Sequence, residues 1–151
     1  MFIIFLVTFI GLMGFGIILP LFPFYAERLG ASPEIITLTM AIFSLGQFFA
    51  APFWGRLSDS IGRKKVLIIS LFGSAMSYVL LAFADTLELV ILSRVFSGLM
   101  AGNISIAFAY VTDITDEQNR SAGLGKVSAA LGLGFMTGPA IGGLLAGSDV
   151  E

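Results

Sequence analysis

The stretch GRLSDSIGRKK, from Gly55 to Lys65, is a polar segment between two long apolar runs. It gathers more charges than any other part of the chain. Gly55 opens it, Asp59 follows four residues later, and Gly62 precedes three consecutive cations. Glycines permit a tight reversal of the chain, and Asp59 can cap a helix or pair with a neighbouring cation. We therefore expect a loop of defined shape here, joining two helices.

The composition places the rest of the chain in lipid. Hydrophobic residues make up 57% of the sequence and charged residues only 12%. A soluble domain of this size cannot hide so much apolar surface from water. The sequence has no cysteine and no histidine, which excludes disulfides, thiol nucleophiles, histidine metal sites and imidazole-based triads. We expect neither an enzyme nor a metal or other cofactor, and no nucleic-acid partner.

Five apolar stretches are each long enough to cross a bilayer, which takes about 20 helical residues. The sequence predicts membrane-spanning helices over Phe2–Phe24, Ile35–Phe53, Val66–Phe83, Leu87–Thr112 and Gly123–Ala146. Helices satisfy their own backbone groups in lipid. The connections are short and polar, and no linker divides the chain. We therefore expect an all-α transmembrane bundle and one domain over residues 1–151.

The distribution of cations predicts the orientation of these helices. With a cytoplasmic amino terminus, the outer side holds Arg28 alone. The inner side then holds six cations: Arg56, Arg63, Lys64, Lys65, Arg120 and Lys126. Tyr25 and Trp54 occupy positions at which interfacial aromatic residues are expected.

The Gly55–Lys65 segment resembles the signature between the second and third helices of major facilitator superfamily transporters. The shared positions are Gly55, Leu57, Ser58, Asp59, Gly62, Arg63, Lys64 and Lys65. Ser60 replaces a customary cation. The resemblance implies an amino-terminal six-helix half-bundle, of which this chain contains five helices. A positive-inside loop with incidental glycines is the simpler alternative.

A second polar segment, TDITDEQNR from Thr112 to Arg120, extends the resemblance. By position it implies a charge network of Asp59, Arg63, Asp113 and Arg120 on the cytoplasmic side. Our hypothesis is that this network closes the cytoplasmic gate when the transporter opens outward. Plain solvation of interfacial charges is the alternative.

Arg94 lies inside the fourth apolar stretch, followed by Gly98 and Gly102 at four-residue spacing. A central arginine costs about 2.5–3.5 kcal/mol on insertion, so it needs a partner or a wet cavity. The segment resembles the fourth-helix motif of the superfamily, in which a buried arginine is associated with proton coupling. An arginine that snorkels to the interface is the alternative. The spans hold no acidic residue near mid-membrane, whereas Gln47 and Asn103 offer amides to a substrate or to neighbouring helices.

The fifth apolar stretch is rich in glycine. Gly134, Gly138 and Gly142 recur every four residues and form a smooth packing stripe, and Pro139 is expected to kink the helix. With Gly125, they resemble the fifth-helix signature of drug:proton antiporters in the superfamily. General close helix packing explains the stripe alone. GLGKVS, residues 123–128, lacks the upstream glycine and the strand of a phosphate loop, so it is no ATP site.

Together these resemblances imply a proton-coupled exporter of a small amphipathic, drug-like compound, as in tetracycline and multidrug efflux proteins. We expect a multi-pass protein of the plasma (inner) membrane, working by alternating access together with a missing carboxyl-terminal half. A sugar or metabolite transporter of the same superfamily is one alternative. A non-transporting membrane assembly protein from a truncated gene, ending at Glu151, is another.

Overall fold

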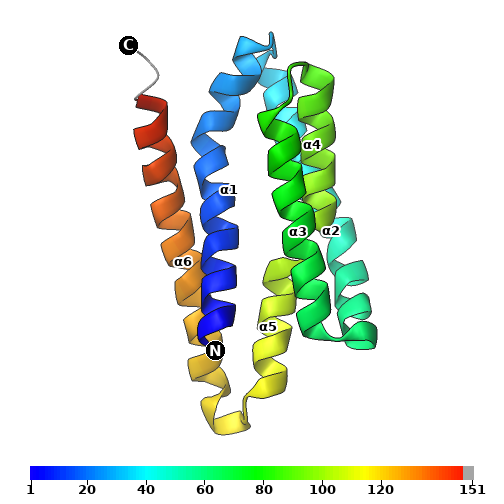
Figure 1. Cartoon of the computed structure of the whole chain (residues 1–151), viewed down its shortest axis with the longest axis vertical. Helices are drawn as coiled ribbons and strands as arrows, with labels where there is room; N and C mark the ends of the chain where they lie inside the picture. Colours follow the sequence, from blue (N-terminus) through cyan, green and yellow to red (C-terminus); the bar gives the residue numbers. More distant parts are fainter. Residues whose placement is uncertain (148–151) are drawn as a thin grey trace. The chain divides into compact units, whose positions relative to one another are not determined.

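The computed structural model describes residues 1–147, which form six helices and no strand (Figure 1). The helices are α1 Phe2–Arg28, α2 Pro33–Ile61, α3 Arg63–Ala82, α4 Leu87–Met100, α5 Asn103–Ile114 and α6 Glu117–Gly147. Five helical stretches are long and apolar enough to cross a membrane, with Leu87–Ile114 counted as one. The all-α transmembrane prediction is confirmed. The last four residues of the domain predicted over 1–151 lie outside the described residues.

The predicted loop from Gly55 to Lys65 is wrong, because this segment is almost entirely helical. Helix α2 continues to Ile61 and α3 starts at Arg63, so Gly62 alone separates them. Gly62 has φ +100°, a conformation that side-chain-bearing residues rarely adopt. The polar residues mark where the helices leave the apolar layer, and a helix can continue into water beyond that point. The same reason extends α1 to Arg28 and starts α6 at Glu117.

The span predicted over Leu87–Thr112 corresponds to one apolar stretch, Leu87–Ile114, but this stretch is two helices separated by Ala101 and Gly102. At this break, side chains of α2 and α3 donate hydrogen bonds to carbonyl groups of Leu99 and Met100. These partners come from distant parts of the sequence, so hydrophobicity along the fourth span gave no sign of the break.

The chain divides into two compact units, described separately. One unit comprises residues 1–25 and those from 107 onward. In it, α1 and α6 lie side by side and run in the same direction (Figure 1). A Cβ atom added to Gly138 would lie 2.7 Å from Gly16 Cα, so the two backbones are nearly in contact. A small core of Ile4, Ala107, Val111 and Val127 completes this unit.

The second unit comprises residues 26–106 and contains α2, α3 and α4. Helices α2 and α4 approach closely where Gly46 meets Gly98, because a Cβ at Gly46 would lie 3.2 Å from the Gly98 carbonyl carbon. Hydroxyl groups lie in the interior of this unit. Ser77 and Ser93 each donate to a carbonyl one turn earlier in their own helix, Ser74 O at 2.6 Å and Val90 O at 2.7 Å. These buried hydroxyls are therefore satisfied without a partner helix.

Candidate functional site

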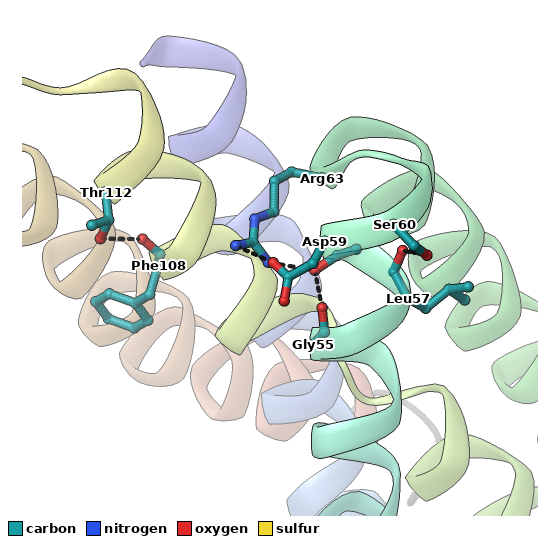
Figure 2. A network of polar contacts seen from close by, with 8 residues as sticks. Gly55, Leu57, Asp59, Ser60, Arg63, Phe108 and Thr112 are labelled. Carbon is teal, nitrogen blue, oxygen red and sulfur yellow. Dashed lines mark hydrogen bonds and ion pairs between the residues drawn. The ribbon is translucent and has the colours of Figure 1, made fainter.

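The junction of α2 and α3 holds an ion pair across Gly62. Arg63 Nη2 lies 2.6 Å from Asp59 Oδ1, one helical turn away along the chain (Figure 2). Arg63 Nη1 donates to Ser58 Oγ at 2.6 Å, and Ser58 Oγ donates to the Gly55 carbonyl at 2.7 Å. The arginine therefore ties the first turn of α3 to two residues in the last turns of α2. Ser58 is buried, whereas the Asp59 side chain is 62% exposed.

The other two members of the predicted charge network belong to the first unit. Asp113 is exposed near the end of α5, and Arg120 is half-buried in the first turn of α6. Arg120 Nε is buried and finds no hydrogen-bond partner among the described residues. The structure thus forms the Asp59–Arg63 half of the network, and the four-charge network stays a prediction.

Arg94 lies within α4 and is 4% exposed, so its side chain is inside the helical unit and does not reach a free helix end. Ser93, which precedes it, and Ser97, three residues later, are also buried. Tyr78 of α3 is close enough to interact with Arg94 electrostatically. The predicted cation inside the fourth span is present there; its role in proton coupling stays a prediction.

The two predicted amides belong to α2 and α5. Gln47 follows Gly46, which packs against Gly98, and Asn103 is the first residue of α5. Both side chains are half-buried. Both residues are therefore partly exposed, and a substrate-binding role would require such access.

The glycines of α6 fall into two groups. Gly134, Gly138 and Gly142 abut α1, where added Cβ atoms would lie 2.6–2.7 Å from Phe9 O, Gly16 Cα or Ile17 O. Pro139 lies inside α6, which continues beyond it. Its Cδ atom lies 3.0 Å from a Cβ built on Gly16. Gly125 has open space around it, so packing within the described residues does not explain this position.

The sequence did not predict the roles of two residues that contact the break between α4 and α5. Trp54, expected as an interfacial aromatic, is buried at 5% exposure, and its indole Nε1 donates to Leu99 O at 2.6 Å. Ser70 donates to Met100 O at 2.8 Å. The only signal in the sequence is Gly102, whose missing side chain makes room for the indole ring.

Comparison with known proteins places this arrangement in a family. The sequence model of the Major Facilitator Superfamily matches residues 4–149. The chain is 33% identical over 146 residues to a tetracycline resistance protein, class H, of Pasteurella multocida, covering 95% of this chain and 36% of that protein. It is 36% identical over 144 residues to multidrug resistance protein 2 of Bacillus subtilis (strain 168), covering 95% of this chain and 36% of that protein. It is 31% identical over 146 residues to the quinolone resistance protein NorA of Staphylococcus aureus (strain Mu50 / ATCC 700699), covering 96% of this chain and 38% of that protein.

The chain therefore spans little more than a third of the length of these relatives. Their matches nevertheless run across nearly all of it, and so does the family model. The chain belongs to the Major Facilitator Superfamily, a family of membrane transporters and not of enzymes.

Proposed function

We propose that this chain is part of a secondary active transporter that exports a small amphipathic, drug-like compound in exchange for protons. The observation that carries the proposal is the ion-paired α2–α3 junction, in which Arg63 joins Asp59 and Ser58 across Gly62. The named relatives, which are tetracycline, multidrug and quinolone resistance proteins, support the substrate class. The rest of the transporter supplies the opposite side of the substrate path.

The junction acts as one half of a cytoplasmic gate. An exposed ion pair such as Asp59–Arg63 contributes only about 0–1 kcal/mol by itself. Contacts of Arg63 with Ser58 hold its guanidinium in place, so that Asp113 and Arg120 can extend the pair into a network in one transporter state. Such a network is enough to bias two states that differ by a few kcal/mol.

The substrate path and the coupling site use the polar groups within the apolar spans. Arg94 supplies a positive charge inside the membrane, which interacts favourably with a carboxylate or a substrate group of opposite charge. Gln47 and Asn103 offer amides to a substrate. The spans contain no mid-membrane acidic residue, so the proton-carrying carboxylate lies in another part of the transporter.

The proposed orientation puts the amino terminus in the cytoplasm of a plasma (inner) membrane. Arg56, Arg63, Lys64 and Lys65 all lie at the α2–α3 junction, and Arg120 and Lys126 lie in the first turns of α6. Cations gather on the cytoplasmic side of membrane proteins, which makes these helix ends the inner ones.

Transport by everted membrane vesicles tests this function directly. Vesicles containing the natural protein are expected to accumulate tetracycline or ethidium when a proton gradient is imposed, and to lose it when the gradient is collapsed. Asp59→Asn is expected to reduce the rate at least tenfold without reducing the amount of inserted protein, because it removes the anionic half of the gate.

Asp85→Asn is the matched control, since Asp85 is an exposed carboxylate in the connection between α3 and α4. It should transport at the wild-type rate. Equal transport by both variants would contradict the gate. Failure of the wild-type protein to accumulate either compound would contradict the drug-export proposal and leave the family assignment intact.

A further inference from the structure

The break between α4 and α5 removes helical partners from two carbonyl groups inside the apolar fourth span. In a continuous helix, Leu99 O and Met100 O would accept hydrogen bonds from the N–H groups of residues 103 and 104. Here α4 ends at Met100 and α5 begins at Asn103. Lipid offers no water to replace these bonds, so an uncapped break would be strongly unfavourable.

Side chains from two other helices cap both carbonyl groups. The Trp54 indole Nε1 of α2 donates to Leu99 O at 2.6 Å, and Ser70 Oγ of α3 donates to Met100 O at 2.8 Å. Met100 O also accepts a 2.8 Å bond from the Gly102 backbone N–H. Trp54 and Ser70 are buried, at 5% and 0% exposure, so water does not compete for either bond.

The packing around the break is adapted to the indole. A Cβ atom on Gly102 would lie 2.5 Å from Trp54 Cγ, which is closer than real Cβ atoms approach any heavy atom. On the α3 side, a Cβ on Gly73 would collide with the Met100 side chain. Glycines therefore stand where Trp54 and Met100 come closest to the neighbouring backbone.

We infer that Trp54 and Ser70 are positioning residues that hold the fourth span as two helices. By capping the end of α4 they fix where α5 begins, and Asn103 is its first residue. Any part that Asn103 plays in substrate binding rests on the proposed transport function. The capped break does not, because it depends only on hydrogen bonds within residues 26–106.

Distance measurement between spin labels tests the inference without transport. The sequence has no native cysteine, so Glu88→Cys and Ser105→Cys introduce two exposed labelling sites that flank the break. A continuous helix would separate these two positions by about 25 Å along its axis. With Trp54 and Ser70 intact, the doubly labelled protein in lipid nanodiscs is expected to give a distribution of label distances distinct from that of a continuous helix.

Two separate substitutions remove the caps. Trp54→Phe keeps an aromatic ring against Gly102 and loses the N–H, and Ser70→Ala loses the hydroxyl. Each is expected to move the distribution toward about 25 Å, because a continuous helix returns the two carbonyls to their helical partners. Ser77→Ala is the matched control. Ser77 is an equally buried serine of α3, whose hydroxyl bonds to Ser74 O in its own helix.

The control should keep the wild-type distribution. Wild-type distributions in both Trp54→Phe and Ser70→Ala would overturn the inference. An equal shift in Ser77→Ala would also overturn it, because loss of any buried hydroxyl would then loosen the helix. Loss of transport in these variants with unchanged distances would likewise overturn the inference, because the two residues would then affect transport without holding the break.

Discussion

At the scale of single residues, Gly62 is held in a backbone conformation that depends on the absence of a side chain. Its φ of +100° joins the end of α2 to the start of α3, and a Cβ atom added there would meet no atom within 4 Å. The cost of Gly62→Ala is therefore purely conformational. We expect the variant to lower the free energy of unfolding by about 1–3 kcal/mol, measured by denaturant titration in detergent micelles.

Gly55 provides the matched comparison, because it lies inside α2 and also has open space where an added methyl group would lie. Alanine favours a helix interior over glycine by about 0.5–1 kcal/mol, so Gly55→Ala should raise the free energy of unfolding by that amount. Equal destabilisation by the two substitutions would show that Gly55 is not helical and that the segment is a loop.

Substitution of Arg94 distinguishes a role in transport from a role in holding the fold together. A buried ionic group is often replaced by an apolar one of similar size without loss of stability, and removal of arginine also lowers the cost of membrane insertion. We expect Arg94→Met to insert and unfold like the wild type, or to be more stable, and to lose proton-coupled tetracycline uptake at least tenfold. Wild-type uptake would exclude Arg94 from coupling. Unfolding of the variant would instead make the arginine a structural residue.

At the scale of helices, contact between α1 and α6 depends on glycines that bring their backbones together. Gly138 is buried at this contact, with the position of its missing Cβ 2.7 Å from both Gly16 Cα and Met13 O. Both atoms are backbone atoms and cannot turn aside. Gly138→Ala is therefore expected to lower the free energy of unfolding by about 1–3 kcal/mol, the usual cost of overpacking, measured by denaturant titration.

Gly132 lies on the exposed face of the same helix with nothing within 4 Å. Gly132→Ala should leave stability unchanged or raise it by up to about 1 kcal/mol. If Gly132→Ala destabilised the protein as much as Gly138→Ala, general intolerance of α6 to alanine would explain both results, and the close α1–α6 contact would not.

The sequence predicts helices well where the physics is local and poorly where it is not. Length and apolarity alone identify five spans, and the spacing of Asp59 and Arg63 allows their pairing within one helical turn. The break in the fourth span depends on Trp54 and Ser70, which lie 45 and 30 positions from the carbonyls they cap. Gly102 lies at the break, but the sequence around it does not identify the residues that cap these carbonyls.

The positions of the helix ends were predicted wrongly for a related reason. Polar residues of the Gly55–Lys65 segment indicate where the chain meets water, whereas the backbone turns only where Gly62 adopts its unusual conformation. The proposed gate is likewise predictable only in its local part. Its local ion pair follows from spacing, but the contribution of Asp113 and Arg120 depends on tertiary packing between separate parts of the chain.

At the scale of the whole molecule, the orientation in the membrane follows from charge and can be tested by chemical access. The α2–α3 junction carries Arg56, Arg63, Lys64 and Lys65, while the α3–α4 connection carries no cation. Because cations favour the cytoplasmic side, the junction should face the cytoplasm and the connection the outside. Ser60 and Asp85 are exposed at these two places, and the sequence has no cysteine to interfere with labelling.

Single-cysteine variants report the side on which each position lies. A membrane-impermeant maleimide should label Asp85→Cys in intact cells and Ser60→Cys only after the cells are permeabilised. Phe72→Cys, in the middle of α3 on its exposed apolar face, should stay unlabelled in both conditions because a thiol in lipid is not ionised or hydrated. The reverse pattern for Ser60 and Asp85 would place the amino terminus outside. The ion-paired junction would then face the wrong side for a cytoplasmic gate, whatever the protein transports.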